Sequence, residues 1–140
     1  MIVLDTNIIS EMMRPHPEIR VVEWLAAQPL SSMFTTTVTQ AEILYGLALL
    51  PEGRKRDDLV AAVRPIFDET MAGRILSFDG DAALAYPAIV VERRQSGHPI
   101  SQFDAQIAAI VRSRGASLAT RNTRDFAGCG IDTIDPWDIG

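Results

Sequence analysis

The sequence has few of the residues on which several classes of protein depend. Its 140 residues include one cysteine, Cys129, and only two histidines, His16 and His98, each beside a proline. A single cysteine excludes a disulfide framework and a zinc site built from thiolates. A chain of this length buries about two-thirds of its unfolded surface, so it needs neither device for stability. We therefore expect a single domain over residues 1–140, located in the cytoplasm.

Basic residues and long apolar runs are also scarce. Lysine and arginine total 13 against 18 acidic residues, which gives a net charge of −5. This balance excludes passive electrostatic adhesion to nucleic acid or to an anionic membrane, although it allows a nucleic-acid enzyme that brings its own metal cation. No apolar run approaches the roughly 18 residues of a membrane-spanning helix. The first residues lack a basic region and a cleavage site, so we expect neither a signal peptide nor membrane association.

Patterns typical of strands and helices alternate along the chain. Short apolar or β-branched runs predict strands at 2–4, 33–37, 74–78, 118–120 and 131–134. Helical spacing predicts helices at 8–13, 18–27, 39–50, 54–69 with an irregularity at Pro65, 79–95 and 101–114, and one helical turn at 122–126. Such an alternation indicates βαβ units, and therefore an α/β fold whose parallel sheet is covered on both faces.

Acidic and amide side chains follow several of these strands. Asp5 comes directly after the first strand, and Glu42 lies one turn into the helix after the second. Asn122 and Asp125 follow the fourth strand, and Asp104 lies in the first turn of the most apolar helix. The carboxyl ends of parallel strands meet at one edge of the sheet, where ligands bind. We therefore expect these residues to converge there, with Asp104 pointing inward.

A purely structural interpretation competes with a functional one. Thr39–Glu42 and Ser101–Asp104 have the form of helix capping boxes, and Asn122–Asp125 is a looser version. Each acid would then serve the amide donors and the positive end of a helix. Capping does not explain Asp5, which ends a strand, and it does not explain why the acids share one edge of the predicted sheet.

Convergence of the acids would have a chemical consequence. Two carboxylates about 5 Å apart repel each other by roughly 3 kcal/mol at an effective dielectric constant of 20. A cluster of acids must therefore bind protons or hold a cation. Oxygen ligands without histidine or cysteine select Mg²⁺ or Mn²⁺. The chemistry that this predicts is metal-assisted hydrolysis of a phosphodiester.

Four segments of the chain resemble, in order and with the usual spacing, the four motifs of PIN-domain ribonucleases. They are Met1–Ser10, Thr39–Gly46, Phe103–Ala109 and Thr120–Phe126. The length and the Pro136-Trp137 ending are similar to those of the VapC toxin branch and of the FitB-like group within it. The resemblance covers nearly the whole chain.

This resemblance implies a fold, an activity and partners. The fold would be a PIN-like three-layer α/β/α sandwich with a central, mostly parallel sheet of four or five strands. The activity would be that of a Mg²⁺- or Mn²⁺-dependent endoribonuclease, the toxin of a type II toxin–antitoxin pair. The partners would be an RNA substrate, a second copy of the chain and a cognate VapB-like or FitA-like antitoxin, with DNA bound only through the antitoxin.

The resemblance also implies roles for individual residues. Asp5 and Asp104 would be the principal metal ligands, and Glu42 would complete the site directly or through water. We favour Asp125 over Asn122 as the fourth member of the catalytic set, because some relatives have an acid at the position of Asn122 and others have one three residues later. Polar contacts to the acids or to the substrate would come from Thr6, Asn7, Thr120, Asn122 and Arg121, and RNA contacts from the arginines near the expected cleft, Arg112, Arg114, Arg121 and Arg124.

Two alternatives stay open. The chain could be a PIN nuclease outside a toxin–antitoxin pair, or a catalytically inactive PIN fold that acts only as a binding partner. The second alternative conflicts with the intact set Asp5, Glu42, Asp104 and Asp125, because an inactive site is free to lose its acids.

Overall fold

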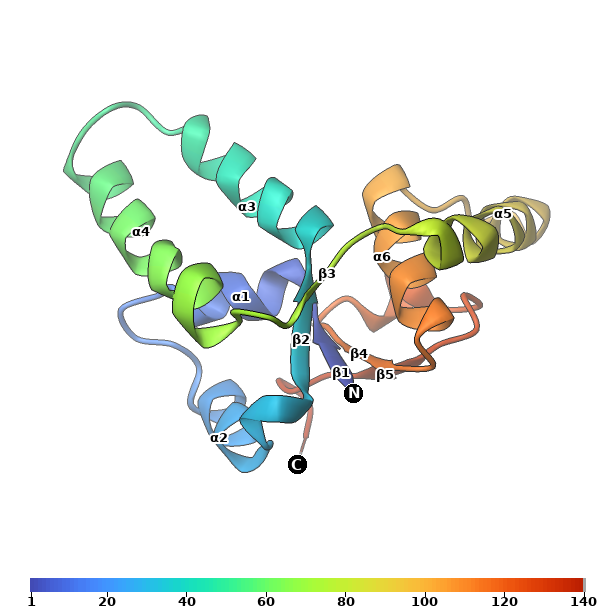
Figure 1. Ribbon diagram of the computed structural model, residues 1–140, viewed down its shortest axis with the longest axis horizontal. Helices are drawn as coiled ribbons and strands as arrows, with labels where there is room; N and C mark the ends of the chain where they lie inside the picture. The colour runs from blue at the N-terminus through green and yellow to red at the C-terminus, as the bar shows by residue number, and fades with distance from the viewer. Residues whose placement is uncertain (140) are drawn as a thin grey trace.

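The computed structural model describes residues 1–139, which form a five-stranded sheet between two layers of helices (Figure 1). Every pair of neighbouring strands is parallel, and the strand order is β3-β2-β1-β4-β5. The α/β prediction and the expectation of four or five mostly parallel strands are therefore confirmed. The strands are β1 (Ile2–Leu4), β2 (Met33–Thr36), β3 (Ile75–Leu76), β4 (Ser117–Ala119) and β5 (Asp132–Ile134).

Six α-helices and three short helical turns connect the strands within the described residues. The helices are α1 (Thr6–Met12), α2 (Ile19–Ala27), α3 (Thr37–Ala48), α4 (Arg54–Pro65), α5 (Gly80–Gln95) and α6 (Gln102–Ser113). The turns are η1 (Leu30–Ser32), η2 (Ile66–Thr70) and η3 (Thr123–Phe126). In Figure 1 the sheet is seen on edge, with α1 to α4 on its left and α5 and α6 on its right. Within residues 1–139 none of these helices combines the length and the hydrophobicity that crossing a membrane would take.

The central strand is buried on both of its faces, as its unbroken apolar sequence predicts. Val3 packs into a core cluster with α5 and α6, whereas Leu4 packs into a second cluster with α1 to α4. Successive side chains of a strand point to opposite faces, so two adjacent residues of β1 anchor both helical layers. Each such side chain contributes about 1.5–3 kcal/mol by leaving water.

The expected start of α3 is wrong by two residues. β2 ends at Thr36, and Thr36 is also the N-cap of α3, because its Oγ1 accepts a hydrogen bond from the amide of Thr39 at 3.0 Å. The run Thr35-Thr36-Thr37 suits a strand and a helix start equally well, so the sequence pattern did not locate the boundary. Thr39 is therefore a fully buried residue of the first helical turn and not a cap.

Most of the other predicted elements differ from the structure by one or two residues at an end, and two of them differ more in extent. The helix expected at 54–69 ends at Pro65 and continues as the π-helical turn η2, in which the amide of Met71 donates to the carbonyl of Ile66 at 2.8 Å. The irregularity predicted at Pro65 is thus confirmed. The strand expected at 74–78 is reduced to two residues, because β3 is an edge strand that pairs only with β2.

Replacement of the cap should destabilise the fold measurably. We expect Thr36→Ala to lower the free energy of unfolding by about 0.5–2 kcal/mol, since the Thr39 amide would lose its partner in a buried setting. Urea unfolding followed by circular dichroism measures this change. The matched control is Thr37→Ala, at the exposed first position of α3. Equal stability of the two variants would contradict the assignment of Thr36 as the cap.

Candidate active site

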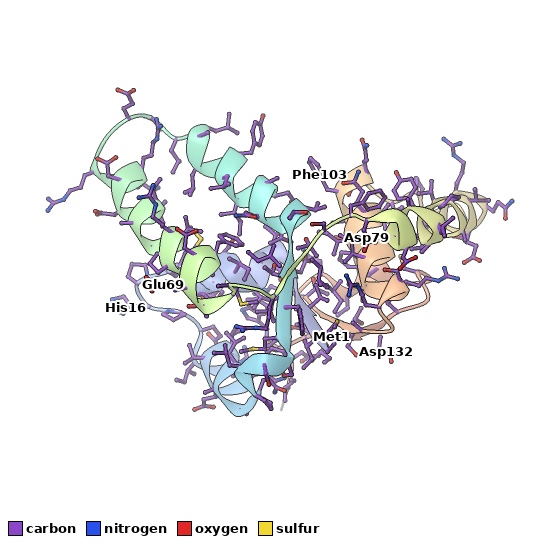
Figure 2. The ribbon with its side chains drawn as sticks, viewed as in Figure 1. Met1, His16, Glu69, Asp79, Phe103 and Asp132 are labelled. Atoms are coloured by element: carbon purple, nitrogen blue, oxygen red, sulfur yellow. The ribbon has the colours of Figure 1, made fainter. Side chains whose placement is uncertain are left out.

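An open cleft lies at the carboxyl ends of the central strands. Figure 2 shows Met1 and Asp132, which precede or begin strands, at one end of the sheet, and Phe103 near the start of α6 at the opposite end. The cleft has a volume of about 550 Å³ at that second end. It is lined by Asp5, Thr6, Asn7, Ser10, Glu11, Arg14, Glu42, Asp104 and Asn122.

Asp5 stands at the floor of the cleft and is only 5% exposed. It ends β1 and is at the same time the N-cap of α1, since its Oδ1 accepts from the amide of Thr6 at 2.8 Å. The expectation that capping does not apply to Asp5 is therefore wrong. Capping uses one carboxylate oxygen, and the other, Oδ2, accepts from the hydroxyl of Thr120 at 2.8 Å.

The Thr120 hydroxyl is the centre of a small polar network behind Asp5. While donating to Asp5, it accepts from the Asn7 side-chain amide at 3.2 Å and from the backbone amide of Asn122 at 3.1 Å. The Asn7 side-chain oxygen accepts from the backbone amide of Arg121 at 3.1 Å. These bonds join the segment after β1 to the segment after β4. Asn7 and Thr120 both contact the Asp5 carboxylate in this way.

Two further carboxylates reach the cleft from helices. Asp104 lies in the first turn of α6, where Ser101 is the cap and accepts from the Asp104 amide at 3.2 Å. This confirms Ser101 as the cap and leaves the half-buried Asp104 side chain lining the cleft. Glu42 lies on α3, and within the part of the chain that the structure describes its buried Oε1 has no hydrogen-bond partner. A buried carboxylate oxygen without a partner is costly, so a cation or water is expected to meet it.

Burial and nearby negative charges disfavour ionisation of the three carboxyl groups. Burial is the main cause that raises the pKa of Asp5, Glu42 and Asp104. The charge of Asp5 raises the pKa of the other two acids further, and Asp104 does the same to Glu42. Hydrogen bonds offset part of the shift at Asp5, that from Thr120 most strongly. A site that resists negative charge in this way favours a bound cation.

The two candidate residues of the fourth motif, Asn122 and Asp125, occupy different positions relative to the cleft. Asn122 lines the cleft, whereas Asp125 is exposed on η3 and does not line it. The charge of Asp125 nevertheless raises the pKa of both Asp5 and Asp104, so its carboxylate is within electrostatic range of the site. The assignment of Asp125 as the fourth acid stays a prediction.

The candidate RNA-binding arginines separate into two groups. The Arg121 guanidinium lies 5.1 Å from the centre of the Trp137 ring, beside the polar network. Arg112 and Arg114 lie at the far end of α6, roughly 12 Å or more along the helix axis from Asp104. Arg114 pairs there with Asp79 at 3.6 Å, and Arg112 lines a separate pocket. The expectation that these two arginines border the cleft is wrong.

Sequence reasoning missed Glu11, Arg14 and Arg93. Glu11 is 5% exposed and lines the cleft, where it accepts from Arg14 Nη1 at 3.1 Å and from the backbone amide of Glu18 at 3.0 Å. Its spacing of four residues from Asn7 placed it on the same face of α1 and was the available signal. Arg93 has no comparable signal, because its partners are backbone carbonyls, two of which lie 32 and 34 residues away.

The donor set suits a hydrated divalent cation. Among residues 1–139 no three acidic, histidine or cysteine side chains lie close enough together to enclose a metal ion. Mg²⁺ does not require such a cage, since it keeps several waters and binds through one or two carboxylates together with substrate phosphates. Asp5, Asp104 and the unpartnered Glu42 Oε1 fit an ion held in this way.

Comparison with known proteins identifies the family. The PIN domain family model matches residues 2–129. The chain belongs to the PIN-domain family. It is 37% identical over 138 residues to the VapC ribonuclease Y4jK of Sinorhizobium fredii, with 99% of each chain covered. It is also 37% identical over 137 residues to the toxin FitB of Neisseria gonorrhoeae, with 98% of this chain and 99% of FitB covered.

The similarity extends to three dimensions. A solved structure of FitAB bound to an IR36 DNA fragment contains a chain that is 36% identical to this one, with a TM-score of 0.91 and coverage of 100% of this chain and 98% of that chain. The predicted PIN-like α/β/α sandwich and the resemblance to the VapC and FitB toxins are therefore confirmed.

The raised carboxyl pKa values predict how stability depends on pH. Between the ordinary values near 4 and the raised values, the folded protein binds more protons than the unfolded chain, so metal-free stability falls as the pH rises through this window. Asp104→Asn removes one of the repelling charges, and we expect its melting temperature in EDTA to exceed that of the native protein above the window. Asp132→Asn, exposed at the opposite end of the sheet, is the control. A lower melting temperature for Asp104→Asn at every pH would mean that the favourable interaction of the Asp104 carboxylate with the N-terminus of α6 outweighs repulsion.

Proposed function

We propose that this PIN-domain protein is a Mg²⁺- or Mn²⁺-dependent endoribonuclease that acts as the toxin of a type II toxin–antitoxin pair. The observation that carries the proposal is that Asp5, Glu42 and Asp104, from three different elements, line the same cleft, where burial raises the pKa of each. The names of the VapC ribonuclease and FitB toxin relatives support the ribonuclease activity and the toxin role.

The residues of the cleft have different proposed roles in binding the metal ion and the RNA. Asp5 and Asp104 would hold the ion, and Glu42 Oε1 would bind it directly or through one of its waters. A bound Mg²⁺ or Mn²⁺ supplies an activated water and stabilises the charge on the leaving oxygen. Thr120 keeps Asp5 oriented and favours its ionised form, because the hydroxyl donates to Asp5 Oδ2. The Asn7 side-chain amide donates to Asp5 Oδ2 and to the Thr120 hydroxyl, so it helps to orient the carboxylate. Asn122 lines the same cleft and is available to orient a phosphate.

An acidic protein must still attract a polyanion. The net charge of −5 opposes non-specific RNA binding, so contacts to phosphate must be local. Arg121 is exposed beside the site and is held over the Trp137 ring. A stacked guanidinium keeps its donors free for phosphate oxygens while losing little conformational freedom. We therefore place Arg121 against the RNA backbone.

The proposed binding partners are based on the complexes in which related proteins have been solved. Solved relatives include FitAB bound to DNA and FitAcB from Neisseria gonorrhoeae, which is 37% identical to this chain with a TM-score of 0.88. We propose that this chain likewise forms a complex with a cognate antitoxin, of the FitA or VapB kind, and pairs with a second copy of itself. DNA would be bound through the antitoxin, since the chain itself is acidic. An antitoxin partner and an RNA substrate support our proposal that the protein acts in the cytoplasm.

The first experiment tests nuclease activity and site together. Antitoxin-free protein is incubated with labelled RNA in Mg²⁺, Mn²⁺ or EDTA, beside Asp104→Asn and the control Asp132→Asn, prepared identically. We expect cleavage that requires metal, is retained by Asp132→Asn and falls at least about 100-fold in Asp104→Asn, because a lost metal ligand removes most of the catalysis.

Other outcomes favour other functions. Equal cleavage by all three proteins would point to a contaminating ribonuclease. Mn²⁺ binding without cleavage of the RNA pool would favour a narrow target. Neither binding nor cleavage would favour an inactive PIN fold. Activity without toxicity on expression in cells would favour a PIN nuclease outside a toxin–antitoxin pair.

Arg121 should affect RNA binding more than chemistry. For Arg121→Gln we expect the KM for RNA to rise several-fold with kcat nearly unchanged, and the slope of log affinity against log salt to become shallower by about 1. Steady-state cleavage at several salt concentrations measures both quantities. Arg54→Gln, at the exposed start of α4, is the matched control. An unchanged KM and an unchanged salt slope would remove Arg121 from the RNA interface.

A further inference from the structure

Arg93, near the end of α5, is a buried arginine outside the cleft. Its side chain is only 8% exposed, although the residues that flank it, Glu92 and Arg94, are exposed. Its Nε donates to the carbonyl of His98 at 2.6 Å, and its Nη1 donates to the carbonyls of Asp125 at 2.7 Å and Ala127 at 2.9 Å. One guanidinium therefore binds three backbone oxygens from two separate loops.

The guanidinium has no carboxylate partner. Within residues 1–139 no acidic oxygen lies within 4.0 Å of Arg93, so the backbone carbonyls are its main partners. Burying a cation is costly unless its donors are satisfied. The planar fork of arginine presents donors in fixed directions, so it sets the relative positions of the carbonyls that it binds. A lysine has no such fork and cannot hold three oxygens in the same geometry.

The two loops that Arg93 joins both lead into the acidic site. His98 belongs to the turn before α6, six residues ahead of Asp104. Asp125 and Ala127 belong to η3 and the residue after it, where the fourth motif ends. Gly128 follows at a φ of +75°, and a Cβ atom there would lie 4.0 Å from Arg93 Cδ. The loop thus passes near the aliphatic part of the arginine, with room at Gly128 for no more than a methyl group in van der Waals contact.

We propose that Arg93 is a positioning residue that holds the Asp125 segment at a fixed distance from Asp104 and thereby sets the geometry of the metal site. This inference rests on the proposed function, because it assumes that Asp125 acts with Asp104 on a cation. Arg93 does not line the cleft, and its hydrogen bonds to the site pass through the backbone of η3. Its charge also lowers the pKa of Asp104, and because lysine keeps that charge, Arg93→Lys tests the positioning separately from the charge. The carboxylate of Asp125 is exposed, and only its main chain is anchored, which makes the anchor the determinant of where that carboxylate lies.

The test compares Arg93→Lys with Arg94→Lys. The first variant keeps the charge but loses the fork, and the second makes the same change at the neighbouring exposed position. We expect Arg93→Lys to weaken Mn²⁺ binding, measured by calorimetry, by about 10–100-fold, as is typical when a group that supports a metal ligand is lost. The amides of residues 123–129 should exchange faster with deuterium. In RNA cleavage kcat should fall while KM changes little, and Arg94→Lys should match the native protein throughout.

A double-mutant cycle tests whether Arg93 affects Mn²⁺ binding through Asp125. Because Arg93 is proposed to act through Asp125, Asp125→Ala alone should weaken Mn²⁺ binding, and Arg93→Lys should add less than about twofold to it. Additive effects would overturn the proposal, and so would native Mn²⁺ affinity in Asp125→Ala or in Arg93→Lys. Failure of both Arg93→Lys and Arg93→Gln to fold would also overturn it, because Arg93 would then determine the whole fold and not one loop.

The same measurements separate this inference from the function on which it rests. Native protein that binds Mn²⁺ but cleaves none of the RNA pool gives the nuclease no support on that substrate, while the affinity comparison still decides the role of Arg93. Native protein that cleaves RNA in Mn²⁺ together with an unchanged Arg93→Lys rejects the role of Arg93 alone.

Discussion

The hydrogen bond from the Thr120 hydroxyl to Asp5 Oδ2 is the contact on which the geometry of the site depends. It joins the residue after β1 to the residue after β4, the two neighbouring strands at the centre of the sheet. Both residues are nearly or fully buried, so the bond forms away from competing water. Asn7 and Asn122 attach to the same hydroxyl, and the start of α1 attaches to the other oxygen of Asp5. Most of the polar floor of the cleft is therefore fixed by one threonine.

Around this fixed floor the protein concentrates negative charge that it does not neutralise. Glu42 and Asp104 converge on Asp5 from two helices that cover opposite faces of the sheet, and neither takes part in an ion pair in the part of the chain that the structure describes. Glu11, in the same cleft, does have a cationic partner in Arg14. The contrast separates a carboxylate that supports the local structure from carboxylates left for a ligand.

Much of this arrangement could be predicted because it follows from short-range rules. Parallel strands bring their carboxyl ends together, so the positions of Asp5 and Asn122 in the sequence were enough to predict that both line one cleft. The inward direction of Asp104 could be predicted from a second rule, since residues three and four apart lie on the same face of a helix. The boundary at Thr36 could not be read, since three consecutive threonines satisfy strand and helix-cap preferences at once. The role of Arg93 could not be predicted either. Two of its carbonyl partners are 32 and 34 positions away, and every residue has a backbone carbonyl, so the sequence does not indicate which ones it binds.

The absence of any loop between β2 and α3 has a consequence for how the site tolerates change. Thr36 ends the strand and caps the helix, so Glu42 is held at a fixed number of residues from the sheet. A helix turns by about 100° for each residue, and an insertion or deletion between positions 36 and 42 would swing Glu42 out of the cleft. Elsewhere, surface loops can absorb a change in length. At this junction no loop residues are present to absorb such a change, so the number of residues between Thr36 and Glu42 determines whether Glu42 reaches the cleft.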